Sequence, residues 1–293
     1  MTAVYSWFQK NKLRITPYVF LTPNIILFFT FMIAPIIFIF FISFHEWNII
    51  GDPSFIGLSN YTELFFDSLF WTALGNTLYF TIGVVPISAA LGIGGALLLR
   101  MKTPFRAFFR AIFFMPVVVS MVATALIWVW MFNPDFGLIN EWLGYIGVNP
   151  DWLGSTTLAM PAVIIAMIWV QAGYSLVIYL AGVQNVPENL YESAQIDGAN
   201  KWQQFWNVTL PLLKPTTVFV VIILVINTIM AFDLVYTMTS GGPGNSTMIL
   251  INYIFRASFE EGAMGYGAAL GVVQFILVLA ISGISLWLGR EKE

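Results

Sequence analysis

The feature that most constrains this chain is a series of six long apolar runs separated by shorter polar segments. A helix that crosses the hydrocarbon core of a membrane needs about 20 largely apolar residues. Only 9% of the residues are charged, whereas a soluble domain has about 25%, so the chain cannot cover a soluble surface of its size. We therefore expect an all-α polytopic membrane protein with six transmembrane helices. They are predicted at about 17–44, 71–99, 108–132, 158–183, 213–236 and 264–288.

The lysine and arginine residues predict the orientation of these helices, because cytoplasmic loops of membrane proteins carry an excess of both. With the two termini inside, the inner segments contain 11 of the 12 basic residues, and only Arg256 lies outside. The opposite orientation would invert this bias. The first run is longer than the roughly 7–15 residues of a signal-peptide core, so we expect a retained helix. The predicted topology is N-in, C-in, with outer loops at about 45–70, 133–157 and 237–263.

The composition also argues against several kinds of site. A net charge of −3 gives no electrostatic support for binding nucleic acid. The chain has no cysteine, which removes disulfides and thiolate metal sites. Its one histidine, His45, follows the first apolar run, where we expect a solvated or interfacial side chain. No His–acid pair, serine–base pair or metal cluster stands out at membrane depth. We therefore expect no catalytic residues, no metal site, and a single membrane domain over residues 1–293 that contacts lipid.

The fourth connection gathers charged and polar residues between two apolar runs, in the sequence LYESAQIDGANKWQQFWNVTLPLLKP at 190–215. Pro187 and Glu188 favour the start of a helix over 188–197. Gly198 can then supply a sharp turn before a second short helix over 200–208. This pattern predicts a cytoplasmic helix–turn–helix over about 186–212. From the residues alone, it is either an amphipathic anchor on the membrane surface or a docking element for a protein partner.

Four blocks of the sequence resemble the carbohydrate-uptake permeases of binding-protein-dependent ABC importers. ESAQIDGA, followed by Leu210-Pro211, resembles the EAA loop of that family, with Glu192-Ser193-Ala194 in place of the strict E-A-A triplet. The other blocks occur in the same order as in the family. They are FIGLSNYTELF (55–65), FFRAIFFMPVVVSMVATALIWVWMFNPDFGLIN (108–140) and TSGGPGNST (239–247).

The resemblance implies that the helix–turn–helix is a coupling element that docks on a cytosolic ATPase dimer. Glu192 would pair with a basic residue of the ATPase, Ala194 and Ala199 would permit close approach, and Gly198 would make the turn. The chain has no Walker-type sequence, so ATP would be hydrolysed by partner chains and no cofactor is held here. The implied coupling residues are Glu192, Ser193, Ala194, Asp197, Gly198 and Ala199.

The resemblance also implies a bacterial cytoplasmic (inner) membrane location and two further partners. One is a second, homologous permease subunit, because six spans make only half of a translocation path. The other is an extracytoplasmic sugar-binding protein, which would face the loop at 239–247 together with residues 133–152.

Polar residues at membrane depth are costly and therefore candidates for a translocation path. Each of them is also compatible with a simple interhelical hydrogen bond. Amide, hydroxyl and aromatic groups match a sugar, and the family resemblance places substrate contacts in the fourth and fifth runs. The candidate substrate residues are Gln171, Gly173, Tyr174, Asn227, Thr228 and Asp233.

Two alternatives to a sugar importer remain open from the sequence. An ion-coupled secondary transporter often buries ionisable relays or has broken helices at the midplane, and Asp233 is the one acid inside a predicted span. The same importer architecture could carry glycerol-3-phosphate or another polyol. A phosphorylated substrate calls for Arg or Lys facing the cavity, and the spans hold neither away from their inner ends. We therefore expect a neutral sugar, oligosaccharide or glycoside.

Overall fold

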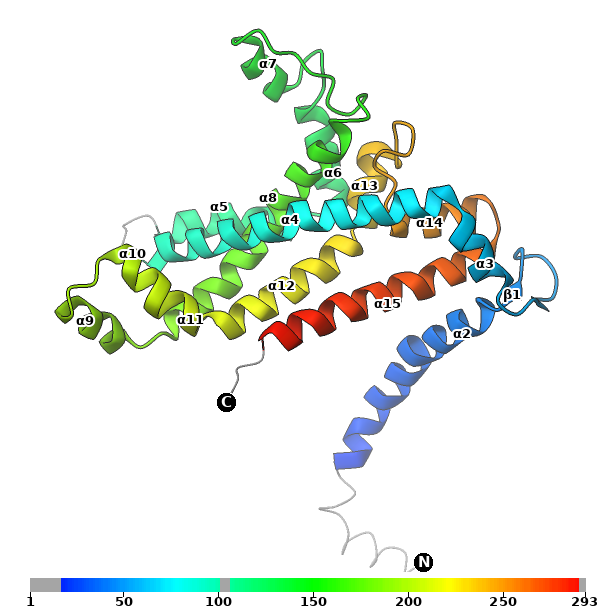
Figure 1. The fold of residues 1–293 in the computed structure, drawn as a ribbon, viewed down its shortest axis with the longest axis horizontal. Helices are drawn as coiled ribbons and strands as arrows, with labels where there is room; N and C mark the ends of the chain where they lie inside the picture. Colours follow the sequence, from blue (N-terminus) through cyan, green and yellow to red (C-terminus); the bar gives the residue numbers. More distant parts are fainter. Residues whose placement is uncertain (1–16, 101–105, 290–293) are drawn as a thin grey trace, which may run out of the picture. The chain divides into compact units, whose positions relative to one another are not determined.

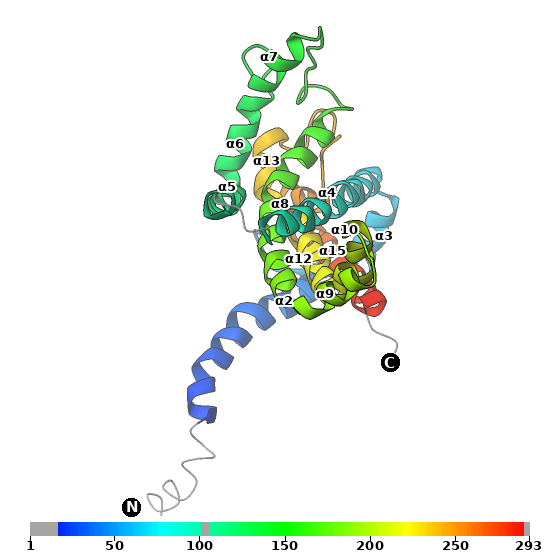
Figure 2. The same ribbon diagram turned by 90° about the vertical axis from the view of Figure 1, so that its left-hand side faces the viewer.

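The computed structural model describes residues 17–100 and 106–289, most of which are helical (Figures 1 and 2). These residues form two compact units, one from the residues up to Leu64 with Ala257–Val272, the other from Phe65–Arg256 with Val273 onward. The all-α fold class is confirmed. In chain order the elements are η1 (Phe29–Ile33), α2 (Ala34–Ile42), β1 (His45–Glu46), β2 (Ser54–Phe55), α3 (Ser59–Phe66), α4 (Ser68–Arg100), α5 (Arg106–Val118), α6 (Met121–Met131), α7 (Leu138–Gly144), α8 (Ala159–Gln184), α9 (Glu188–Ile196), α10 (Lys201–Gln204), η2 (Phe205–Thr209), α11 (Leu210–Leu212), α12 (Lys214–Ile229), α13 (Phe232–Thr239), α14 (Leu250–Phe255), η3 (Arg256–Glu260) and α15 (Met264–Gly289).

The first unit is built on an apolar helix at Pro17–Ile42, which includes η1 and α2. Pro35, at the start of α2, has no N–H for the helical ladder, and the wider π turn of η1 immediately precedes it. Only 6% of the most apolar window of this helix is buried within the chain. Such a helix places its apolar side chains against lipid or against another protein.

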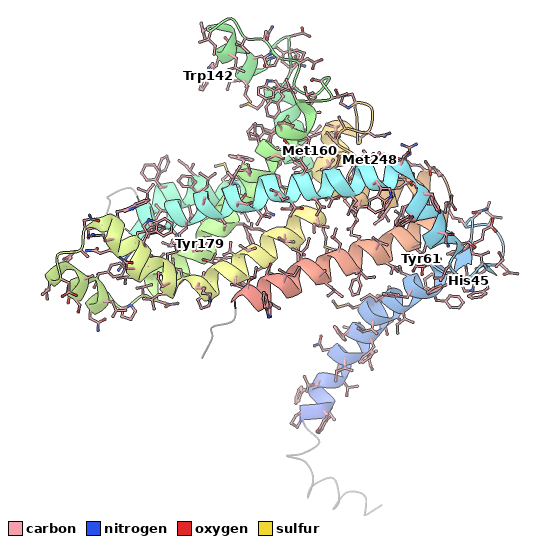
Figure 3. All side chains as sticks on the ribbon, viewed as in Figure 1. His45, Tyr61, Trp142, Met160, Tyr179 and Met248 are labelled. Carbon is pink, nitrogen blue, oxygen red and sulfur yellow. The ribbon has the colours of Figure 1, made fainter. Side chains whose placement is uncertain are left out.

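His45 lies in the loop that follows this helix and is buried (Figure 3). Its Nδ1 atom lies 2.8 Å from the main-chain oxygen of Phe41, and its ring packs against those of Phe41 and Phe55. Asn60 of α3 donates hydrogen bonds to the main-chain oxygens of Ser43 and His45, at 2.9 and 3.0 Å. The expectation of a solvated His45 is therefore wrong, because the β1–β2 pair and Asn60 fold the loop around it.

In the second unit, α4 and α8 cross closely because small residues line the crossing. A side chain at Gly92 would overlap Ser175, and one at Gly95 would overlap Leu176. The Ser175 hydroxyl donates a 2.7 Å hydrogen bond to the main-chain oxygen of Ser88. Small residues let helix main chains approach within reach of such bonds in a membrane.

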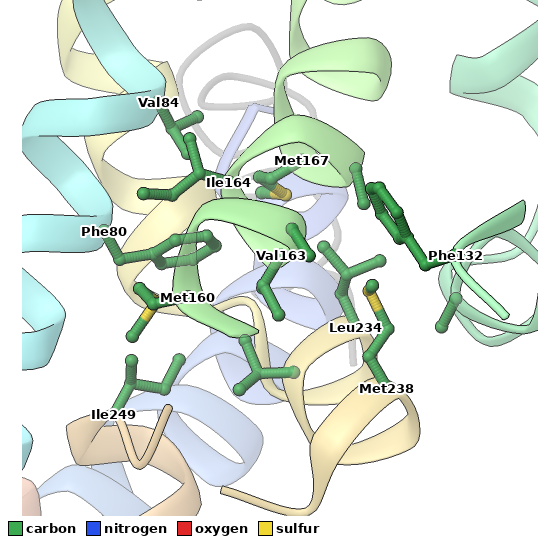
Figure 4. Close-up of a cluster of buried hydrophobic side chains, with 14 residues drawn as sticks. Phe80, Val84, Phe132, Met160, Val163, Ile164, Met167, Leu234, Met238 and Ile249 are labelled. Atoms are coloured by element: carbon green, nitrogen blue, oxygen red, sulfur yellow. The ribbon is translucent and has the colours of Figure 1, made fainter. Parts of the chain in front are cut away.

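Two clusters of buried apolar side chains pack α8 against its neighbours. The first joins α8 to α4, α6 and α13 (Figure 4) and includes Phe80, Val84, Phe132, Met160, Met167, Leu234 and Met238. The second joins α8 to α4 and α12 and includes Leu99, Leu176, Tyr179, Leu180, Leu213, Leu224 and Ile229. Together these clusters place α8 at the centre of the second unit.

Four described helices are long and apolar enough to cross a membrane: Pro17–Ile42, Ser68–Arg100, Ala159–Gln184 and Met264–Gly289. The third predicted run, 108–132, is not one straight helix. It forms α5 and α6, which meet at an angle of 103° around Ser120, whose backbone is extended. Pro116 removes one helical hydrogen bond just before the bend, and β-branched Val117, Val118 and Val119 have lower helix propensity.

The fifth predicted run, 213–236, is also interrupted. The helix α12 ends at Ile229, and α13 begins at Phe232 after a break at Met230 and Ala231. At its other end, α12 meets the preceding helical segment Lys201–Leu212 at 70°. If each bent pair counts as one span, the described residues hold up to six spans, which is the number that the sequence predicts.

Candidate functional site: a helical hairpin and a line of intramembrane polar residues

The helix α9 and the segment that follows it form the predicted helix–turn–helix, called here the hairpin (residues 188–212). Pro187 caps α9 with an extended backbone, and Glu188 lies in its first turn, where the helix dipole favours an acid. Gly198 has φ of +80°, a conformation that glycine adopts without strain. The main-chain N–H of Ala199 then bonds the oxygen of Ala194 at 2.8 Å. The turn at Gly198 is therefore confirmed.

The second half of the hairpin begins with a capping box. Asn200 Oδ1 accepts a hydrogen bond from the N–H of Gln203, and Gln203 Oε1 accepts one from the N–H of Asn200. Gln204 is buried and donates a 2.9 Å hydrogen bond to the main-chain oxygen of Ala199. The helical segment continues through η2 and α11 to Leu212, beyond the predicted end at 208. Asn200, Gln203 and Gln204 thus fix the turn. The sequence analysis missed this role, although the Asn-x-x-Gln spacing of Asn200 and Gln203 signals the capping box.

The candidate coupling residues lie together on the exposed side of this turn. Glu192, Ser193, Asp197 and Gly198 are exposed, while Ala194 and Ala199 are half-buried. Large apolar side chains lie beside them, with Ile196 86% and Trp202 69% exposed. A surface that combines acids with exposed large apolar groups is typical of a site that meets a partner.

A cavity of about 850 Å³ separates the hairpin from the C-terminal end of α4. Charged groups on both sides line it, together with apolar side chains of α4 and η2. The lining residues that bear charge are Arg100, Glu188, Glu192 and Lys201.

The candidate substrate residues of α8 are placed in three different surroundings. Gln171 is 2% exposed, and its Nε2 atom has no hydrogen-bond partner among the described residues. A Cβ at Gly173 would overlap the main-chain oxygen of Phe113 in α5, so this glycine permits a close helix contact. Tyr174 is half-buried. Among the candidate substrate residues, Gln171 is the one whose buried polar atom lacks a partner within the described residues, a state it shares with buried polar atoms elsewhere, such as those of Asn252 and Gln274.

The candidates of the fifth run lie on either side of its break. Thr228 is fully buried, and its hydroxyl donates a 2.6 Å hydrogen bond to the main-chain oxygen of Leu224 within α12. Asn227 is half-buried. Asp233 is exposed and lies in the first turn of α13, where the N-terminus of a helix stabilises a carboxylate. Asp233 is therefore at a helix start, not in the middle of a continuous helix. Within the described residues, no three His, Cys, Asp or Glu side chains gather as a metal site would require.

Residues 85–291, most of the chain, match the family of binding-protein-dependent transport system inner membrane components. The chain belongs to this family. It is a multi-pass protein of the inner membrane, and its family consists of transport components and not of enzymes.

Members of the inner membrane component family that resemble this chain extend over nearly its whole length. The trehalose/maltose transport system permease protein of Thermococcus litoralis is 34% identical over 278 residues, covering 94% of each chain. The arabinooligosaccharides transport system permease protein of Bacillus subtilis is 36% identical over 277 residues, covering 93% of this chain and 88% of the relative. The predicted resemblance to permeases of ABC importers is confirmed.

Solved structures of this family share the fold. A chain of the bacterial alginate ABC transporter, in complex with its alginate pentasaccharide-bound periplasmic protein, superposes with a TM-score of 0.84 at 25% identity. That match covers 97% of this chain and 96% of the other. A second structure of a bacterial ABC transporter for alginate import gives a TM-score of 0.83, with 98% of both chains covered.

Proposed function

We propose that this chain is one permease subunit of an ATP-driven importer and forms half of the path for a neutral sugar, oligosaccharide or glycoside. The observation that carries the proposal is the hairpin, which presents Glu192 and Asp197 on an exposed turn at Gly198. A permease without a nucleotide-binding sequence needs a docking surface through which conformational changes of an ATPase reach its membrane helices. The named relatives, which transport trehalose, maltose or arabinooligosaccharides, support the substrate class.

In this proposal, the coupling residues 192–194 and 197–199 dock on a cytosolic ATPase dimer. Glu192 pairs with a basic group of the ATPase, and the exposed Ile196 and Trp202 bury against apolar groups of the same partner. A second homologous permease completes the path, and an extracytoplasmic binding protein delivers the substrate. Residues 1–293 act as one permease domain with six spans and an N-in, C-in topology.

The proposed substrate contacts are uncharged for the most part, as a neutral sugar requires. Gln171, Tyr174, Asn227 and Thr228 offer amide and hydroxyl groups, and Asp233 offers one carboxylate to sugar hydroxyls. Gly173 completes the proposed set, and it also lets α8 approach α5 closely. The unpartnered amide of Gln171 supports this assignment, because a substrate hydroxyl would supply the missing acceptor.

The proposal is tested by purifying the tagged chain from its native membrane in mild detergent and identifying the co-purifying chains by mass spectrometry. We expect a second permease and an ATPase. The complex is then reconstituted in proteoliposomes with the binding protein, and uptake of trehalose, maltose and arabinooligosaccharides is measured. Uptake that needs ATP and survives collapse of the proton and sodium gradients supports the proposal. Uptake by the lone chain that stops with those gradients would identify a secondary transporter instead.

A further inference from the structure

The helix α9 is held to the rest of the chain by few side chains. None of its nine residues is buried, and the cavity of about 850 Å³ lies between it and the end of α4. Among the described residues, one side-chain hydrogen bond runs from α9 to another element, and Tyr191 makes it. Tyr191 also packs against the second buried cluster. Any displacement of α9 that reaches the membrane helices through side chains therefore passes largely through Tyr191.

One face of the Tyr191 ring meets the last residue of α4. The guanidinium carbon of Arg100 lies 4.1 Å from the ring centroid, a distance at which the ring attracts the cation. Arg100 ends α4, where the helix dipole favours a positive charge. The contact thus joins α9 to a helix that extends for 33 residues through the second unit.

The hydroxyl of Tyr191 meets the segment that leads into α12. It lies 2.9 Å from Oγ1 of Thr209, the last residue of η2. Thr209 is buried, and its Oγ1 also lies 3.4 Å from the main-chain oxygen of Gln204. Either hydroxyl can donate in the bond between Tyr191 and Thr209, and removing either one breaks it. The short helix α11 and then α12 follow directly.

We propose that Tyr191 is a positioning residue that makes α9, the end of α4 and the start of α12 move together. It reaches α4 through Arg100 and the α11–α12 segment through Thr209. The inference rests on the proposed function, since it assigns to Tyr191 the transmission of ATPase movement from the coupling residues to two membrane helices. Without this link, the neighbouring cavity leaves α9 room to move alone.

The absence of cysteine allows a direct test, because two introduced cysteines are then the sole labelling sites of this chain, which is labelled before the ATPase is added. Gln195→Cys on α9 and Leu98→Cys on α4 place spin labels at two exposed positions that line the same cavity. Pulsed electron paramagnetic resonance gives the distance distribution between the labels. It is recorded for the purified full chain, and for its complex with the ATPase before and after trapping with MgATP and vanadate.

In the otherwise unchanged protein, we expect a narrow distribution that keeps its mean and width when ATP is trapped. Tyr191→Phe and Thr209→Val remove the same hydrogen bond, so each should broaden the distribution, and the double variant should be no broader than either single one. Arg100→Gln should also broaden it, and Arg100→Lys should restore it, because a lysine retains the attraction to the ring. Tyr79→Phe, at an exposed position of α4, is the matched control and should change nothing.

The corresponding functional readout is the amount of sugar moved per ATP hydrolysed, with trehalose, maltose and arabinooligosaccharides as probes. Tyr191→Phe should lower this ratio by about fivefold, the factor that one hydrogen bond of ordinary net strength represents in an equilibrium. The ATPase should remain bound, because the exposed coupling residues are unchanged.

Two results would overturn the inference. One is a distance between the two labels that changes, when MgATP and vanadate are added, by the same amount in the protein with Tyr191 as in the Tyr191→Phe variant. The other is an unchanged distribution in both Tyr191→Phe and Thr209→Val. Failure of the proposed function gives a different result, because the lone chain is measured as well. If no ATPase co-purifies but Tyr191→Phe still broadens the distribution, the link stands and the importer assignment fails.

Discussion

The side-chain amide of Asn76, in α4, donates a 2.9 Å hydrogen bond to the main-chain oxygen of Met248, which lies 172 positions later in the chain (Figure 3). The same amide donates a second bond, of 3.0 Å, to the main-chain oxygen of Asn245. The next residue, Thr77, accepts a 2.9 Å hydrogen bond from the N–H of Leu250. Two adjacent side chains of α4 therefore fasten the loop between α13 and α14.

We predict that Asn76→Asp loosens this loop, because the carboxylate has the same shape but neither of the two donors. Two main-chain oxygens then lose their partners, at a cost of about 1–3 kcal/mol each if they stay buried. Limited proteolysis within 239–247 should become faster, and the melting temperature in detergent should fall. Thr77→Val removes the neighbouring acceptor and should act in the same direction. Equal proteolysis rates in wild type and both variants would contradict this role.

Glu192→Lys is expected to abolish ATP-driven uptake by reversing the charge at the centre of the coupling residues. Loss of a buried, hydrogen-bonded charge pair costs about 2 kcal/mol or more, so the affinity for the ATPase should fall by about 30-fold or more. Co-purification then becomes weak but detectable, and binding can be titrated with purified ATPase.

The matched control for Glu192→Lys is Gln195→Lys, which adds a positive charge to an exposed position of the same helix. It should retain most uptake. If Gln195→Lys is as damaging as Glu192→Lys, the general charge of α9 matters and not the pairing of Glu192. If Glu192→Lys takes up sugar at the wild-type rate, Glu192 does not couple the permease to the ATPase.

The α4–α8 crossing predicts opposite effects for two glycines of one helix. A Cβ at Gly92 would overlap the side chain of Ser175, whereas a Cβ at Gly94 meets nothing within 4 Å. Gly92→Ala should therefore destabilise the fold by about 1–3 kcal/mol through overpacking. Gly94→Ala should be neutral or stabilising, since alanine has the better helix propensity. Thermal unfolding followed by circular dichroism distinguishes the two, and equal melting temperatures would refute the close crossing.

Asp233→Asn is expected to change substrate handling while leaving the fold nearly intact. The carboxylate is exposed in the first turn of α13, and losing its interaction with the helix dipole costs only about 0.3–1 kcal/mol. Initial uptake rates over a range of sugar concentrations should show an altered half-saturation or maximal rate. If uptake is unchanged at every concentration, Asp233 does not contact the substrate.

The hairpin was predictable because its signals are local. Pro187 before the helix and Gly198 after it determine where α9 begins and ends, and both act through their own backbone preferences. The contact of Tyr191 with Arg100 was not predictable, because it joins residues 91 positions apart. It exists only once α8 has brought the hairpin back to the end of α4.

The two interrupted spans show what hydrophobicity alone cannot predict. Apolar character is continuous across 108–132, so hydrophobicity alone predicts one helix, although Pro116 and Ser120 were available as signals of the bend. The break at Met230 and Ala231 contains neither glycine nor proline. A break of this kind carries no local signal that a sequence pattern could report.

That second break has a consequence for how such a protein can be studied. The 16 residues of α12 rise about 24 Å, less than the roughly 30 Å of a hydrocarbon core, so α12 alone cannot make the crossing. Helix ends leave main-chain N–H and C=O groups without helical partners, and at that depth such groups persist only against protein or water. Alanine scanning replaces side chains and leaves these main-chain N–H and C=O groups in place. Two relatives whose helices end at the same depth can therefore expose the same main-chain polar groups there. They can do so without sharing any polar side chain.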